Sequence, residues 1–338
     1  MANRSMTAEG PPVRRFSKEE GYVYNSYGPA TYLKHVVASL STLRRYDKDR
    51  PVALVCTDEH RQLLKEYQLT SMFDEILPIR EEHASIVGFK HNLHSYMPFR
   101  RNLYLDSDIV WCRNPDPLWT SLSIYDFTIT GLQVSDNFFG ASKSFSVLSD
   151  ILFQRRSRTL NRFGITQLSR VQSGMIYGAD KELTRSICGL AADILSRKGE
   201  THFQSRLSEK GRNQESCEWS LAMAMAKKNL QVYPWHQGHE SPQLDYLKEY
   251  TRHDPDFRKV ECTFYCDPFV YSLRGLKSNW IRTRLLWLFS LFPGMGDYIK
   301  TTPYCLHFGW VHQKKPFFDF AERNWMRLTV ETTRGTMA

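Results

Sequence analysis

Tyr104-Leu105-Asp106-Ser107-Asp108-Ile109-Val110 is an apolar segment interrupted by two carboxylates that lie one residue apart. The apolar residues predict a strand, and open α/β sheets bind their ligands at the carboxyl ends of strands. Mg²⁺ and Mn²⁺ prefer carboxylate oxygens combined with oxygens of a substrate phosphate. The segment therefore predicts a divalent-metal site for a diphosphate, formed by Asp106 and Asp108. An ordinary acidic pair at a turn remains the alternative, because acidic residues are common where chains turn.

The chain before this motif alternates between strand and helix patterns. Strands are predicted at 21–25, 51–58, 75–79 and 102–106, and helices at 30–43, 59–67 and 89–96. Such alternation is typical of a parallel sheet covered by helices. After the motif, strands are predicted at 127–131, 171–177 and 231–235 and helices at 181–198 and 215–227, whereas 138–152 is ambiguous. The sequence therefore predicts an α/β fold.

Composition and charge narrow the class of partner. The net charge of +9 suits an anionic substrate, an anionic membrane surface or nucleic acid. The sequence shows no zinc-finger spacing, RNA-recognition motif or lysine-rich arm, so we expect no nucleic-acid partner. The seven cysteines are odd in number and scattered, which predicts free thiols and a cytoplasmic protein. Half of a zinc site at Cys262 and Cys266 is the alternative.

No membrane-crossing segment is expected. The first 15 residues lack an apolar core of the kind found in signal peptides, and the apolar stretch 280–292 is shorter than the ~20 residues that span a bilayer. The segment 274–293 is nevertheless basic and aromatic. It could be a buried helix whose arginines extend to water, or an interfacial helix at an anionic membrane surface, which would make the protein peripheral.

Near the end of the chain stand His307-Phe308-Gly309 and Lys314-Lys315-Pro316-Phe317. With the Asp-x-Asp motif and the preceding strands and helices, these segments resemble the GT-A nucleotide-sugar glycosyltransferases. The similarity is greatest to glycosyltransferase family 8, the class of glycogenin and the bacterial lipo-oligosaccharide galactosyltransferases. It implies a GT-A type fold, with a mostly parallel central sheet flanked by helices.

The resemblance also implies an activity and a domain layout. The activity is metal-dependent transfer of a hexose from a UDP-sugar to a hydroxyl of a glycan, glycolipid or protein, with retention of anomeric configuration. The layout is a single domain at 21–328, between a flexible N-terminus at 1–20 and a flexible tail at 329–338. Its half at 21–130 would bind the nucleotide, and its half at 131–328 the donor sugar and the acceptor.

Specific residues take roles by the same resemblance. Asp106, Asp108 and His307 would hold Mn²⁺ or Mg²⁺, and Glu215 and Glu218 would lie near the anomeric carbon and the acceptor. Lys315 would be the cation on the leaving phosphate, with Lys314 left open as the alternative. The positions expected to bind the nucleotide-sugar are Tyr24, Asn25, Tyr27, Lys90, Asp106, Ser107, Gln172, Ser173, Gly174, Gly309, Lys314 and Lys315.

Structural roles remain open for several of these residues. His307 could be a hydrogen-bonded core histidine and Lys90 a solvated helix residue. Glu215 and Glu218 could form the acidic first turn of a helix, which the helix dipole favours. Gly174 could mark a close backbone approach, and Tyr24 and Tyr27 could be core aromatics.

Two other functions also remain open. Asp106-Ser107-Asp108-Ile109-Val110 fits the nucleophile strand of haloacid-dehalogenase-type phosphatases, although Gly296-Asp297 lacks the second acid of their later motif. A non-catalytic protein that binds nucleotide-sugars is the other alternative.

Overall fold

The computed structural model describes residues 19–335, except 136, 138, 141–145, 204, 206, 208–213, 235–240, 266, 268–269, 271–272, 274–275, 277, 295 and 310–312. The expectation of a flexible N-terminus therefore falls almost entirely outside the described residues. Cys266, half of the alternative zinc pair, also lies outside them.

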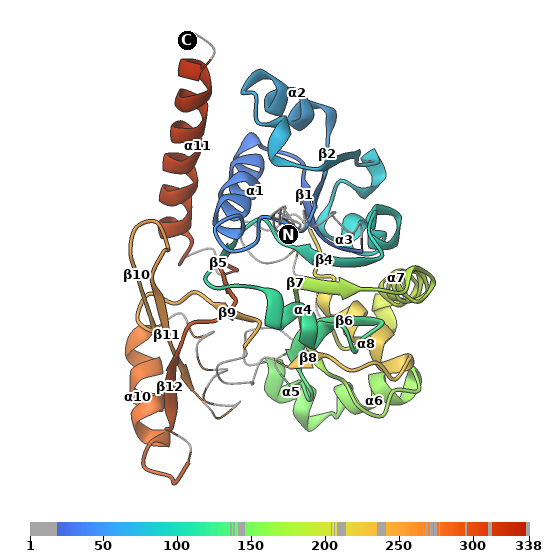
Figure 1. The fold of residues 1–338 in the computed structure, drawn as a ribbon. Helices are drawn as coiled ribbons and strands as arrows, with labels where there is room; N and C mark the ends of the chain where they lie inside the picture. The colour runs from blue at the N-terminus through green and yellow to red at the C-terminus, as the bar shows by residue number, and fades with distance from the viewer. Residues whose placement is uncertain are drawn as a thin grey trace, which may run out of the picture.

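The centre of the fold is a seven-stranded sheet with the order β3-β2-β1-β4-β7-β6-β8 (Figure 1). The pairs β3–β2, β2–β1, β1–β4 and β6–β8 are parallel, and only β7 runs antiparallel to its neighbours β4 and β6. The strands are β1 Glu20–Ser26, β2 Val52–Cys56, β3 Glu75–Pro78, β4 Arg101–Leu105, β6 Phe127–Leu132, β7 Arg170–Gly178 and β8 Tyr233–Pro234. The predicted fold class, an α/β fold with a mostly parallel central sheet, is confirmed.

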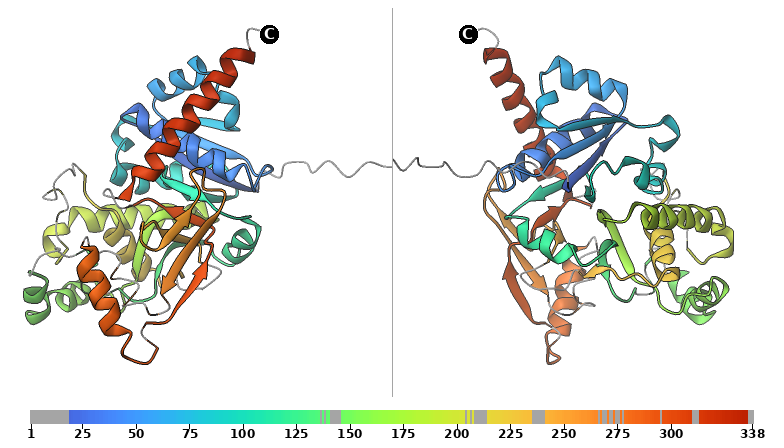
Figure 2. Two further views of the ribbon diagram at one scale, coloured as in Figure 1. Left: turned by 90° about the vertical axis from the view of Figure 1, so that its left-hand side faces the viewer. Right: turned by 45° about the vertical axis from the view of Figure 1, so that its right-hand side comes forward.

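Helices cover both faces of this sheet. The helices are α1 Ala30–Leu43, α2 Asp58–Glu66, α3 Ile86–Lys90, α4 Asp116–Leu122, α5 Ser146–Leu152, α6 Arg155–Arg162, α7 Lys181–Ser196, α8 Glu218–Lys227, α10 Asn279–Phe289 and α11 Lys315–Gly335. Short 3₁₀ turns lie at Thr70–Met72, Glu81–His83, Leu93–Tyr96 and Lys198–Glu200. The two further views show α11 running beside α1 (Figure 2).

Alternation along the strands explains this two-sided burial. Tyr22 and Tyr24 of β1 pack in one core with α1, α4 and α11, whereas Val23 packs in a second core with α3, α7 and α8. Successive side chains of a strand point to opposite faces, so the apolar run of β1 fills both cores.

Two smaller sheets lie beside the central one. The first has the order β5-β13-β9, from β5 Ile109–Trp111, β13 Cys305–His307 and β9 Gln243–Asp245. The second has the order β10-β11-β12, from β10 Thr251–His253, β11 Val260–Tyr265 and β12 Tyr298–Thr301. The chain leaves the central sheet after β4 and enters the first small sheet at β5. The strand predicted at 102–106 corresponds to β4, and the two aspartates lie in the turn between β4 and β5.

Several predicted boundaries were wrong. The helix expected at 89–96 is the short helix α3 followed by a 3₁₀ turn at Leu93–Tyr96. The helix expected from Glu215 begins at Glu218, and the strand expected at 231–235 is reduced to Tyr233–Pro234. The helix α11 continues to Gly335, into the segment 329–338 for which a flexible tail was expected.

Six cysteines of the described residues are free and buried, as the odd, scattered pattern predicted. Within the described ranges, no helix combines the length and the apolarity needed to cross a bilayer.

Candidate metal centre

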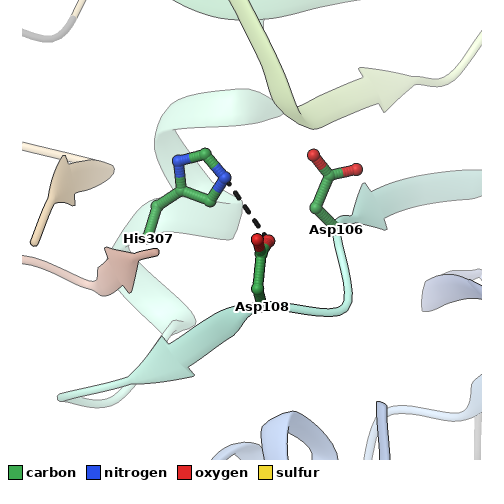
Figure 3. Close-up of side chains that lie close together, drawn as sticks. All are labelled: Asp106, Asp108 and His307. Carbon is green, nitrogen blue, oxygen red and sulfur yellow. Dashed lines mark ion pairs between the residues drawn. The ribbon is translucent and has the colours of Figure 1, made fainter. Parts of the chain in front are cut away.

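Asp106, Asp108 and His307 converge at the junction of the central sheet and the first small sheet. One ligand atom from each lies within 4.8 Å of the others. Figure 3 shows the two carboxylates and the imidazole turned toward a common point. The sequence prediction that these three side chains meet is therefore matched by the geometry.

Backbone pairing fixes the three positions. The Asp106 N–H donates to the Gly174 carbonyl of β7 at 2.9 Å, and the Phe308 N–H donates to the Asp108 carbonyl at 3.0 Å. Antiparallel pairing places His307 of β13 opposite Ile109 of β5, next to Asp108. The His307 Nε2 atom lies 3.5 Å from Asp108 Oδ1.

Each carboxylate of the cluster has its own lysine. Lys90 Nζ lies 2.9 Å from Asp106 Oδ1 and also donates to the Ser173 carbonyl at 2.9 Å. Lys314 Nζ donates to Asp108 Oδ2 at 2.6 Å. Burial opposes the charge of both lysines, but the adjacent aspartates outweigh it and raise the pKa of each ammonium above its usual range. Two ammonium groups therefore accompany the two carboxylates of the cluster.

The Nδ1 atom of His307, on the side away from the two aspartates, contacts Asp245 and Gln172. It lies 2.9 Å from Asp245 Oδ1 and 2.6 Å from the Gln172 amide nitrogen. In the neutral imidazole, Nδ1–H donates to Asp245 and Nε2 keeps a lone pair directed toward the two aspartates. Gln172, expected to line the donor sugar, therefore packs against the far side of His307. Gln243 donates a hydrogen bond to the Gln172 amide oxygen on the same side of the imidazole.

Asp245 and Gln243 were missed by sequence reasoning. They belong to the three-residue strand β9, and the register of the parallel pair places Asp245 beside His307. A strand this short carries no periodic signal, and the sequence around it contains no known motif.

Two glycines leave room for the imidazole. A Cβ atom at Gly309 would lie 2.6 Å from His307 Cε1, and one at Gly174 would lie 3.2 Å from His307 Nε2. The glycine of the His-x-Gly segment is thus explained by the space that His307 needs.

We expect Gly309→Ala to displace the His307 ring and to weaken Mn²⁺ binding by about 10- to 100-fold, the usual cost of disturbing a ligand's support. Titration calorimetry with Mn²⁺ measures the change. Gly189→Ala is the matched control, because a Cβ atom there meets nothing within 4 Å. Equal Mn²⁺ affinity of the two variants would contradict this role of Gly309.

The protonation of His307 makes metal binding depend on pH. Burial alone would lower the pKa of His307, but the carboxylates of Asp108 and Asp245 outweigh it and raise the pKa to about 10. A metal-bound imidazole nitrogen carries no proton, so Mn²⁺ must displace it. We expect Mn²⁺ affinity to rise about tenfold per pH unit between about pH 7 and pH 9.

Calorimetry in buffers of different ionisation enthalpy should show release of about one proton per Mn²⁺ at pH 8. A histidine with an ordinary pKa of about 6.5 would release almost none there. The folded pKa lies above the unfolded value, so the stabilisation from His307 is fully present below about pH 6.5. The metal-free protein should therefore lose stability as the pH rises toward 10.

Some of the other predicted residues lie near the cluster, and others point away from it. Asn25 and Tyr27, at the end of β1, lie near Asp106. Tyr104 Oη is 3.0 Å from Asn25 Oδ1 and 2.6 Å from Asp106 Oδ1. Burial, with a smaller contribution from the charge of Asp106, raises the pKa of Tyr27. Ser107 is partly buried in the turn between the aspartates.

Glu218 also reaches the site, through Ser173. Its carboxylate accepts a hydrogen bond from the Ser173 N–H at 3.4 Å. Ser173 itself is buried beside Lys90, which donates to its hydroxyl at 3.0 Å.

Three expected roles do not fit the geometry. Tyr24 is 0% exposed and bonds with Ser39, because alternation along β1 turns it toward α1 and away from Asn25. Glu215 precedes α8 and pairs with Lys198 instead of sharing a helical face with Glu218. The side chain of Lys315 is 82% exposed and pairs with Asp319 one helical turn on, so Lys314 is the lysine at the cluster.

Solved structures that match this chain include glycosyltransferases. GlyE of Streptococcus pneumoniae TIGR4 matches at 11% identity and a TM-score of 0.47, over 95% of this chain and 64% of that one. The galactosyltransferase LgtC, in complex with donor and acceptor sugar analogs, matches at 9% identity and a TM-score of 0.49, over 92% of this chain and 95% of that one. The bifunctional glycosyltransferase WbbM matches at 13% identity and a TM-score of 0.47, over 100% of this chain and 55% of that one.

These solved structures are glycosyltransferases by name, which is the class that the sequence motifs resemble. This chain spans less than two thirds of the length of GlyE. No sequence profile of a protein family and no curated protein sequence matches the chain. At such low identities and TM-scores, the chemistry rests on the site itself.

Proposed function

We propose that this protein is a metal-dependent glycosyltransferase that moves a hexose from a UDP-sugar to a hydroxyl of a glycan, glycolipid or protein. The observation that carries the proposal is the convergence of Asp106, Asp108 and His307 between two lysines. Retention of anomeric configuration follows from the resemblance to family 8. The free buried thiols support a reducing compartment such as the cytoplasm.

The donor set fits a divalent cation. Two carboxylates and one imidazole nitrogen would hold Mn²⁺ or Mg²⁺, and the remaining ligand positions suit diphosphate oxygens. A cation bound there would supply positive charge against the diphosphate that departs in the transfer.

Lys314 and Lys90 are the cations that the chain itself provides. Lys314 contacts Asp108 through a side chain that is 20% exposed, so it can reach a phosphate placed beside that aspartate. We propose that Lys314 stabilises the charge that develops on the leaving UDP, the task first assigned to Lys315. Lys90 holds the carboxylate of Asp106 and the backbone of Ser173, and so fixes the donor side of the site.

The remaining residues are assigned to the two substrates. Asn25 and Tyr27 are proposed to hold the base and the ribose, and Gly174 lets the donor sugar approach β7. Glu218, held against Ser173, is proposed to orient the acceptor hydroxyl or to stabilise an oxocarbenium-like transition state. No covalent intermediate is assigned.

The observations favour sugar transfer over the two alternatives. A haloacid-dehalogenase-type phosphatase completes its metal site with a second acidic motif. Among the described residues, the one cluster with ligand spacing is completed by the imidazole of His307. A non-catalytic binding protein would bind UDP without turnover, which the assay below measures.

Thermal unfolding with UDP, in the presence of Mn²⁺ or of EDTA, tests the proposal. We expect UDP to stabilise the protein only with Mn²⁺; free ligand at 100 times its Kd stabilises by about 2.7 kcal/mol. Slow UDP-glucose or UDP-galactose hydrolysis, or transfer to an added sugar, should accompany this binding. Hydrolysis of a phosphate ester without UDP binding would establish the phosphatase instead, and UDP binding without any turnover would establish the binding protein.

A further inference from the structure

The helix α10 exposes its apolar residues and buries a charged one. Arg282 is its only residue that is buried, with 1% of its surface exposed. Surface helices of globular proteins normally show the opposite arrangement, with an apolar stripe toward the core. Packing within this chain therefore does not explain why the apolar residues of α10 face outward.

Polar contacts of Arg282 attach the helix to the rest of the protein. Its guanidinium pairs with Glu249 at 2.9 Å, donates to the Leu276 carbonyl at 2.8 Å and donates to the Tyr250 hydroxyl at 3.2 Å. Leu286, one turn further along, lines a small cavity beside the same arginine. These contacts define the inner face of α10, which lies beside β11 and β12 at the edge of the molecule (Figures 1 and 2).

The outer face forms one continuous apolar stripe. The exposed fractions are 69% at Trp280, 45% at Ile281, 60% at Trp287, 45% at Leu288, 62% at Leu291 and 55% at Phe292. These positions follow each other at i, i+1, i+7, i+8, i+11 and i+12, which places them on one side of a helix opposite Arg282. Leu291 and Phe292 continue the stripe in hydrogen-bonded turns just after the helix. Contiguous exposed apolar surface of this kind marks an interaction site.

We propose that this stripe, Trp280 to Phe292, docks the protein on an anionic lipid membrane surface. The stripe combines aromatic and aliphatic residues with one basic residue, Arg284, whose guanidinium lies 5.7 Å from the Trp280 ring. Tryptophan and arginine suit the headgroup layer, and isoleucine, leucine and phenylalanine suit the acyl boundary below it. Of the two structures that the sequence left open for this segment, the interfacial helix is the one that accounts for the outward stripe.

Charge favours a lipid surface over a second copy of this chain. The chain carries a net charge of +9, so two copies repel each other while an anionic leaflet attracts each of them. The docking does not depend on which reaction the metal centre performs, because none of its residues belongs to that centre.

Co-sedimentation of the full chain with vesicles tests the proposal. We expect binding to vesicles of phosphatidylcholine mixed with phosphatidylglycerol, and weaker binding to phosphatidylcholine alone or at high salt. The double change Trp280→Ser and Trp287→Ser should weaken binding at least about tenfold, because it removes two interfacial aromatic anchors. Arg284→Glu should weaken binding to the anionic vesicles and leave binding to phosphatidylcholine alone unchanged.

The matched control is the pair Ile124→Ser and Met326→Ser, whose side chains are 80% and 56% exposed in other parts of the fold. This control should bind like the unchanged protein. If the tryptophan variant unfolds at a lower temperature than the control, Leu291→Ser with Phe292→Ser replaces it. Equal vesicle binding by stripe and control variants would overturn the proposal, as would no binding by the unchanged protein. A dimer that the stripe changes dissociate, without vesicle binding, would identify a second copy as the occupant and would also overturn it.

Discussion

Asp108→Asn should abolish the stabilisation by UDP in the presence of Mn²⁺ and slow sugar transfer by about 100- to 1,000-fold. The amide keeps the shape of the side chain but removes the charge that binds the cation. It also removes the anionic partner of Lys314, 2.6 Å away, and of His307, 3.5 Å away. Thermal unfolding with UDP, with and without Mn²⁺, measures the binding, and release of UDP measures the transfer.

The control for this change is Asp319→Asn, which removes a carboxylate that is 50% exposed and pairs with Lys315 on the surface. A pair so exposed contributes about 0–1 kcal/mol, so transfer should stay unchanged. Asp108→Asn also removes the carboxylate that pairs with the partly buried Lys314, whereas His307 keeps its contact with Asp245 at 2.9 Å, so the variant should be less stable. UDP binding with and without Mn²⁺ is therefore also measured by calorimetry at a temperature at which the variant is folded. Normal Mn²⁺-dependent UDP binding by this variant would remove the basis of the assignment.

Lys314→Met should change metal binding and transfer in opposite directions. The ammonium of Lys314 occupies Asp108 Oδ2, so its removal should tighten Mn²⁺ binding about tenfold in the absence of nucleotide. Loss of the same cation from the leaving diphosphate should slow transfer about 100- to 1,000-fold. Calorimetry with Mn²⁺ and a steady-state assay of UDP release separate the two effects.

Lys315→Met is the matched control, one residue away and of the same type. Its side chain is 82% exposed and pairs with Asp319 at the surface of the protein. We expect unchanged Mn²⁺ affinity and unchanged transfer. If Lys315→Met slowed transfer and Lys314→Met did not, the assignment made from the resemblance would be right and the geometric one wrong.

The first half of the fold was predictable because its signals are local. The strands predicted at 51–58 and 102–106 and the helix predicted at 30–43 each depend on a pattern within one element, and they correspond to β2, β4 and α1 to within a few residues. The helix at 89–96 was wrong because its apolar residues pack in a short helix and a separate 3₁₀ turn. Residue spacing alone did not show where the helix stops.

The candidate site was predictable where a motif carries the chemistry. The aspartate pair and the late His-x-Gly segment each indicated residues of the candidate site, and Gly309 has a steric reason that follows from His307. Tyr24 could have been excluded from the sequence, because the alternation of β1 puts it on the face of Tyr22 and not of Asn25. The choice between Lys314 and Lys315 could not be made, because adjacent residues at a helix start point about 100° apart and the position of α11 was unknown.

The amino-acid sequence by itself determined the alternating strands and helices and the pair of carboxylates that follows β4, since both depend on neighbours along the chain. Only the tertiary structure decided that β13 lies between β5 and β9, with His307 facing Asp108 and Asp245 behind it. Those strands have three residues each, too few for a periodic pattern. Their partners come from distant parts of the chain and are selected by backbone hydrogen bonds and by packing of the whole fold.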